Sequence, residues 1–169
     1  MLVVRAETPA DRDAVREVNE RAFGQRTEAD LVEALRGAGC PHVSLVAESG
    51  GRVVGHVFFS PVLIEAEGGT SEAFALGPMA VLPEFQRRGV GSALVRRGLE
   101  ECRRLGREVV FVLGHPEYYP RFGFGTAAAR GFRCQYPVPD EVFMVVELSE
   151  GAAAGLSGLV RYRPEFGDF

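Results

Sequence analysis

The stretch LGPMAVLPEFQRRGVGSAL, residues 76–94, is the part of the sequence that decides the fold. It opens on an apolar run typical of a strand, passes through a turn containing Gly89 and Gly91, and continues into a helical pattern of apolar residues. The first backbone N–H groups of a helix have no acceptor within the helix, and the positive end of the helix dipole lies beside them. The stretch therefore predicts an anion-binding turn whose glycines allow a pyrophosphate to approach the backbone closely.

Positive charge gathers on the helix that follows this turn. Between Gln86 and Arg107 there are seven Arg and two Glu, a balance of +5, whereas the whole chain of 169 residues carries −4. Arg87 and Arg88 lie at the amino-terminal end of the helix, where the dipole disfavours cations by about 0.3–1 kcal/mol. A bound phosphate would remove that conflict.

Two other nucleotide-binding motifs fit this turn poorly. A P-loop needs Gly-Lys-Ser/Thr, and the chain contains no Lys at all. A dinucleotide-binding fingerprint needs a third glycine at the position of Leu94. From the residues of the turn alone, phosphate binding and a plain helix-start turn are equal alternatives.

The remaining pattern predicts one mixed α/β domain spanning residues 1–169. The composition, 46% hydrophobic and 25% charged, excludes a disordered, collagen-like or coiled-coil chain. Pro78 cannot donate to a strand ladder, so we expect interrupted pairing within the strand 73–82. The expected helices are 8–23, 27–36 and 87–105, with a short helix or turn at 116–122; the expected strands are 2–6, 43–48, 53–64, 73–82, 109–113 and 142–148, followed by a tail at 159–163.

Three blocks of the sequence resemble the GNAT superfamily of N-acetyltransferases. QRRGVG, residues 86–91, is similar to the Q/R-x-x-G-x-G/A acyl-CoA motif of that family, and LGPMAV (76–81) and GHPEYYPRFGF (114–124) are similar to blocks of a bacterial subgroup. The resemblance extends over nearly the whole chain. It implies a mostly antiparallel central sheet with splayed central strands and flanking helices. It also implies an acetyl-CoA-dependent transfer to an amine by direct attack on the thioester.

The same resemblance implies roles for individual residues. Backbone groups of Met79, Ala80 and Val81 would pair with the pantetheine arm, and an N–H near Met79 would polarise the thioester carbonyl. Tyr119, five residues before Phe124, occupies the family's position for the tyrosine that protonates the leaving thiolate; a phenol with a pKa near ~10 can donate that proton. Tyr118, or a Tyr119 that only packs in the core, are the alternatives. The residues of the cofactor turn are Gln86, Arg87, Arg88, Gly89, Val90, Gly91 and Ser92.

The general base is left open by the sequence. Residues 73–75 are Ala-Phe-Ala, where family members often carry a glutamate. Glu72, Glu84, His115, Glu117 and a water relay are the alternatives. Acids on the early helices, among them Glu28, Asp30 and Glu33, either attract a cationic amine or form a solvated face, and the solvated face is the favoured interpretation.

Two rival functions follow from these gaps. A non-catalytic acyl-CoA-binding or sensing module would keep the turn without acid chemistry, and a nucleotide-binding domain unrelated to CoA would use the turn differently. We predict no metal, because the three His and the three Cys show no ligand spacing. The net negative charge outside one helix disfavours nucleic acid as a partner. The number of Cys is odd, they are widely separated, and no apolar run is long enough to span a membrane; these features favour a cytoplasmic protein. The partner is then a small-molecule or peptide amine, and a homodimer is compatible with the sequence.

Overall fold

The computed structural model describes residues 1–167, and the chain divides into two compact units. The first unit contains Met1–Phe59 and Gly77–Glu101; the second contains Ser60–Leu76 and the chain from Cys102 onward. Strands β3 (Arg52–Ala66) and β4 (Gly69–Val81) and helix α3 (Val90–Arg104) each have residues in both units. Each unit is described in turn.

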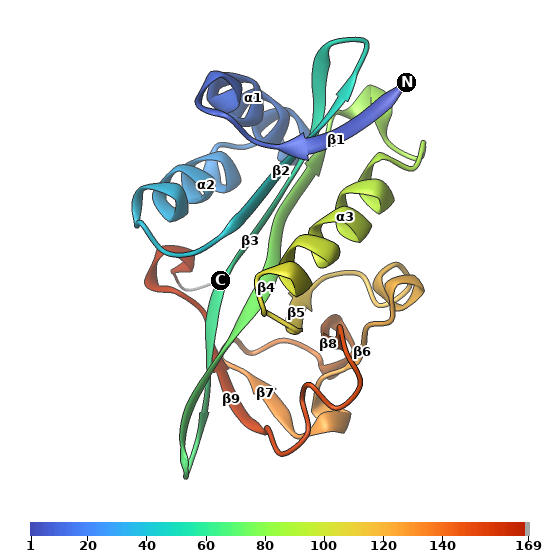
Figure 1. Ribbon diagram of the computed structural model, residues 1–169. Helices are drawn as coiled ribbons and strands as arrows, with labels where there is room; N and C mark the ends of the chain where they lie inside the picture. Colours follow the sequence, from blue (N-terminus) through green and yellow to red (C-terminus); the bar gives the residue numbers. More distant parts are fainter. Residues whose placement is uncertain (168–169) are drawn as a thin grey trace. The chain divides into compact units, whose positions relative to one another are not determined.

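The first unit begins with strand β1 and two adjacent helices (Figure 1). Strand β1 (Leu2–Ala6) pairs antiparallel with β2 (Val43–Ser49), and β2 pairs antiparallel with β3. Helices α1 (Arg12–Phe23) and α2 (Thr27–Gly37) lie between β1 and β2 in the sequence. The Asp11 carboxylate accepts the N–H and the hydroxyl of Thr8 at 2.7 and 3.0 Å, which supports the turn that leads into α1.

A two-residue turn joins β2 to β3. Gly50 and Gly51 have φ of 59° and 78°, and Ser49 pairs with Arg52 across the turn. A positive φ at both central residues is the type I′ geometry, whose twist matches that of the flanking strands. This confirms the hairpin expected from the two glycines.

Helices cover both faces of β3 in the first unit (Figure 1). Gly55 and His56 are successive strand residues and therefore face opposite sides. A Cβ at Gly55 would lie 2.9 Å from Val90 and 3.0 Å from Leu94, so α3 packs directly on one face. His56 lies 3.3 Å from Asn19 of α1, so α1 packs on the other.

A partly buried chain of hydrogen bonds has His56 of β3 at its centre. The Ser44 hydroxyl donates to Glu7 at 2.7 Å, so its oxygen accepts the Nε2–H of His56 at 2.9 Å. Asn19 donates to Nδ1 of the same ring, and Arg36 donates to Glu7 at 2.5 Å. Burial, assisted by the charge of Arg36, lowers the pKa of His56 to about 3. His56 is therefore a neutral core residue.

The second unit is built on strands. Strand β4 pairs in parallel with β5 at Phe74–Leu76, β5 pairs antiparallel with β8, and β8 with β6. Strand β9 pairs antiparallel with β3 and parallel with β7. The five strands that follow β4 are β5 (Val109–Leu113), β6 (Gly125–Thr126), β7 (Phe132–Cys134), β8 (Phe143–Glu147) and β9 (Gly158–Arg161).

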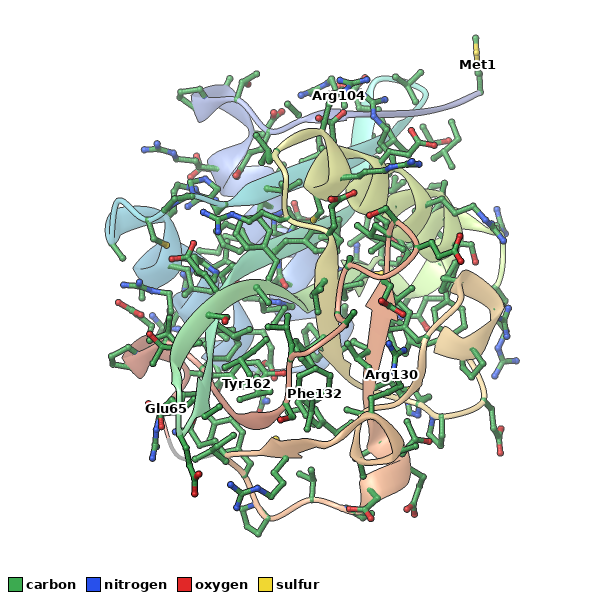
Figure 2. The ribbon with its side chains drawn as sticks, turned by 60° about the horizontal axis from the view of Figure 1, so that its bottom comes forward. Met1, Glu65, Arg104, Arg130, Phe132 and Tyr162 are labelled. Atoms are coloured by element: carbon green, nitrogen blue, oxygen red, sulfur yellow. The ribbon has the colours of Figure 1, made fainter. Side chains whose placement is uncertain are left out.

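Aromatic rings form the centre of this second core. The ring of Phe111 stacks on Phe143 at 5.4 Å between centroids and meets Phe132 edge-on at 5.0 Å. Phe132 and Tyr162, both marked in Figure 2, belong to the same buried cluster. Rings in offset or edge-on contact add about 0.5–1.5 kcal/mol a pair beyond the area that they bury.

The fold confirms the expected mixed, mostly antiparallel α/β class and corrects several boundaries. The ladder between β4 and β5 ends at Leu76, as Pro78 predicts. Helix α3 begins at Val90 rather than at residue 87, because Arg87 and Gly89 have φ of 63° and 83°. Residues 159–163 are not a tail, because most of them form β9, which is held between β3 and β7.

Candidate active site

The turn ahead of α3 has the geometry that the sequence predicts for anion binding. The first hydrogen bond of the helix runs from the N–H of Ala93 to the carbonyl of Gly89 at 3.0 Å. The N–H groups of Val90 and Gly91 precede that bond, where a helix supplies no acceptor of its own. These donors lie at the positive end of the helix dipole.

The backbone of this turn is strained at one residue. Within residues 1–167, Arg87 alone has a positive φ without being glycine. That conformation costs an L-residue about 1–2 kcal/mol, and such strain clusters at functional sites. With Gly89 also at positive φ, left-handed residues flank Arg88. Such alternation turns successive N–H groups toward one side, which makes the concave nest that binds anions.

Side chains hold the turn in place from two directions. The Gln86 amide donates to the carbonyl of Val81 at 3.0 Å, which ties the turn to the end of β4. Arg21 of α1 binds the Glu84 carboxylate with both terminal nitrogens, at 2.9 and 2.7 Å, and lowers the pKa of that carboxyl. The turn is thereby joined to both β4 and α1.

The Phe85 ring adds a third contact to the turn. The guanidinium of Arg88 lies 5.8 Å from its centroid, and that of Arg52 lies 6.0 Å away. Both distances are within the range of a cation–π interaction. The side chain of Arg88 is therefore held against the Phe85 ring at the start of the turn.

The end of β4 offers backbone groups beside this turn. Met79, Ala80 and Val81 lie beyond the last pair that β4 makes with β5. Their N–H and C=O groups on that edge can pair with an extended chain as an added strand would. All ten expected cofactor-binding residues thus fall in the first unit.

Tyr119 lies in the second unit, at the start of a short turn of 3₁₀-helix, Tyr119–Phe122. Its side chain is 7% exposed and meets the rings of Tyr118 and Phe124 edge-on, at 5.1 and 5.7 Å. Burial, together with Tyr118, raises the pKa of Tyr119 to about 12. The phenol therefore keeps its proton at neutral pH and can act as a donor.

Tyr118 has different surroundings. It is partly exposed, and the guanidinium of Arg121 lies 4.4 Å above its ring. The Nε of Arg121 also donates to the carbonyl of Tyr118 at 2.8 Å. A cavity of about 430 Å³ opens here, lined by His115, Pro116, Glu117, Tyr118 and Arg121. Two of the candidate bases, His115 and Glu117, thus line one cavity.

The other candidate bases are held in ion pairs. Glu72 binds Arg107 at 2.5 Å, and Glu84 binds Arg21 as described. A carboxylate with a lowered pKa is a weaker base, which counts against Glu84. Of the candidates named from the sequence, His115, Glu117 and a water relay are left as alternatives for the general base.

The acids of the early helices form an ion-paired face. Arg16 binds both Asp30 and Glu33, at 2.7 and 3.0 Å, and Glu28 accepts two hydrogen bonds from Gln25. These contacts agree with the favoured interpretation of a solvated helix face.

Two further features of residues 1–167 bear on the site. No three His, Cys, Asp or Glu side chains come together in this part of the chain in a way that could hold a metal ion. None of its helices has the length and apolar character needed to span a membrane.

Comparisons with known proteins agree with this geometry. The family profile described as Acetyltransferase (GNAT) domain matches residues 3–127. YjhQ of Escherichia coli, an uncharacterised N-acetyltransferase, is 43% identical over 135 residues, which are 78% of this chain and 75% of that protein. YhbS of Escherichia coli, another uncharacterised N-acetyltransferase, is 35% identical over 169 residues, covering 99% of this chain and 100% of that protein.

Solved structures of two such proteins contain the cofactor. A crystal structure of YhbS in complex with CoA covers 99% of this chain and 93% of that chain, with a TM-score of 0.92. A GNAT family acetyltransferase from Brucella melitensis in complex with acetyl-CoA is 34% identical and covers 98% of both chains, with a TM-score of 0.81.

Proposed function

This chain belongs to the GNAT family of N-acetyltransferases, and from that membership we propose that it transfers the acetyl group of acetyl-CoA to a primary amine of a small molecule or peptide. The amine nitrogen attacks the thioester carbonyl, the C–N bond forms and the C–S bond breaks. The thiolate that leaves takes one proton, and the amine loses one. The observation that carries the proposal is the strained turn, in which Arg87 and Gly89 at positive φ precede the open start of α3.

The cofactor's binding is assigned to backbone groups. The N–H groups of residues 87–92 bind the pyrophosphate, and those of Met79–Val81 pair with the pantetheine arm. An N–H near Met79 polarises the thioester carbonyl as charge builds on its oxygen. The start of α3, where the N–H of Ala93 donates to the carbonyl of Gly89, and the early end of the β4–β5 ladder support these roles.

Tyr119 is assigned the role of the general acid. It donates its phenolic proton to the leaving thiolate, and the raised pKa keeps that proton available at neutral pH. The proton of the amine passes to His115, Glu117 or a water molecule. Separate His115→Gln and Glu117→Gln variants distinguish these three, because the variant that lacks the base loses kcat, whereas both keep it if water takes the proton.

A thiol-release assay tests the activity itself. Acetyl-CoA is incubated with the protein and a panel of small amines and amino-terminal peptides, and free CoA is measured with a thiol reagent. Amine-dependent release of CoA supports the enzyme. Tight CoA binding without turnover on any amine would support the acyl-CoA-binding module, which the absence of a strand glutamate at residues 73–75 favours. Competition by ATP or NAD but not CoA would support the unrelated nucleotide-binding domain.

We also propose that the two units act as one acyltransferase domain in the cytoplasm. The matching profile, residues 3–127, takes in parts of both units, and Cys40, Cys102 and Cys134 are not in disulfides. Limited proteolysis in the presence of CoA tests the single domain, which should resist cleavage as a whole. Cell fractionation tests the cytoplasmic location. Light scattering distinguishes a monomer from a homodimer.

A further inference from the structure

We propose that Gly114 is a positioning residue for Tyr119, whose phenol reaches its place only because residue 114 has no side chain. This inference rests on the proposed role of Tyr119 as the general acid. Gly114 directly follows β5 and is the first residue of the block GHPEYYPRFGF, residues 114–124.

The contact between the two residues is close. A Cβ built on Gly114 would lie 2.3 Å from Cε2 of Tyr119, 3.0 Å from Cδ2 and 3.3 Å from Cζ. Ordinary contacts of this kind are about 3.5–4.0 Å. The φ of Gly114 is outside the left-handed region, so alanine adopts this backbone without strain. The closest conflict that alanine introduces is therefore with the ring.

The backbone at Gly114 is anchored and cannot easily give way. Its N–H donates to the carbonyl of Val142 at 2.9 Å. The residue before it, Leu113, pairs with Phe143 at the end of the antiparallel ladder between β5 and β8. The steric clash with an added methyl group would therefore have to be relieved by movement of the Tyr119 ring.

The ring, in turn, moves only by displacing its neighbours. Tyr119 is 7% exposed, and the rings of Tyr118 and Phe124 contact it edge-on. A shift large enough to restore normal contact, on the order of 1 Å, moves the hydroxyl by a similar amount. Proton donation needs a heavy-atom distance of about 2.6–3.2 Å, and a misplacement of about 1 Å can cost on the order of 10²-fold in rate.

The test is a set of kinetic variants. We expect Gly114→Ala to lower kcat by about 10- to 100-fold. The KM for acetyl-CoA should stay within about twofold of the wild-type value, because the residues proposed to bind the cofactor are not changed. Gly125→Ala is the matched control: it has no atom within 4 Å of its added Cβ, has no positive φ, and should keep the wild-type kcat. In a Tyr119→Phe background, Gly114→Ala should cause no further loss, because the hydroxyl that it misplaces is already absent.

The outcomes separate the inference from the proposed function. A Tyr119→Phe enzyme with wild-type kcat would overturn the acid role and the positioning role with it. A lowered kcat in Tyr119→Phe, together with wild-type kcat in Gly114→Ala or with losses that multiply in the double variant, would overturn the positioning role alone. If Gly114→Ala unfolds, Gly114→Ala/Tyr119→Ala should melt no lower than Tyr119→Ala; a lower melting temperature would show that Tyr119 is not what the methyl group meets.

Discussion

At the scale of single residues, the burial of Tyr119 has a consequence for alkaline pH. Removing water from the ring disfavours the phenolate, and the pKa rises to about 12. The donor form therefore persists through pH 10, and we expect kcat to show no descending limb between pH 8 and about pH 10.5. A fall in kcat near pH 10 that disappears in Tyr119→Phe but persists in Tyr118→Phe would contradict the raised pKa of Tyr119.

Gly89 shows how one backbone angle serves the cofactor turn. Its φ is 83°, and a Cβ there would meet no atom within 4 Å, so Gly89→Ala changes the backbone preference alone. We expect about 1–2 kcal/mol less stability toward urea, together with CoA binding weakened by at least tenfold as the turn relaxes. Gly37→Ala, also free of contacts but without positive φ, is the control and should keep CoA affinity. Unchanged CoA affinity in Gly89→Ala would separate the turn from the cofactor.

At the scale of elements, the Arg21–Glu84 pair connects α1 with the cofactor turn. Both hydrogen bonds are formed, at 2.9 and 2.7 Å, but the pair is exposed, so its effect is expected to be small. We predict that Glu84→Gln weakens CoA binding by less than about fivefold, measured by titration calorimetry, and that added salt reduces the difference. The exchanged pair Arg21→Glu/Glu84→Arg should recover part of the loss. Equal affinity in all three proteins would show that the turn does not depend on α1.

The elements also show what sequence patterns can and cannot predict. Strand β5 and the β2–β3 hairpin were expected at nearly their observed residues, because a continuous apolar run and a pair of turn glycines are local signals. Strands β6 and β7 span only Gly125–Thr126 and Phe132–Cys134, too short for any periodicity to register. Strand β9 exists because β3 and β7 pair with it, which is tertiary information.

The candidate site divides in the same way. The turn ahead of α3 could be predicted from spacing, because a helix start and two glycines are local signals. The contact between Gly114 and the Tyr119 ring could not, because it depends on how the chain returns after β5. The ion pairs that engage Glu72 and Glu84 were equally hidden, since each partner is far away in the sequence.

At the scale of the whole molecule, acid stability depends on groups that titrate in separate windows. The lowered pKa values of Asp11, Glu84, Glu147 and Glu165 come chiefly from hydrogen bonds to the ionised form, and the stability linked to them is lost as pH falls below about 5.5. His56 has the opposite charge type. Its folded pKa of about 3 lies below the unfolded value of 6.5. The stability of the folded chain that is linked to His56 is therefore complete above pH 6.5 and declines as pH falls from there.

The window from pH 6.5 to about 5.5 therefore isolates His56 in global unfolding. There the unfolded chain binds a proton that the folded chain refuses, so we expect the free energy of unfolding to fall by about 1.4 kcal/mol per pH unit below pH 6. Urea titrations at pH 7, 6.5, 6 and 5.5 measure that slope. His56→Gln keeps an amide that can bond Ser44 and Asn19 but cannot titrate, so it should start less stable and lose little over the same range. Equal slopes in the wild type and in His56→Gln would mean that His56 is not held neutral in the core.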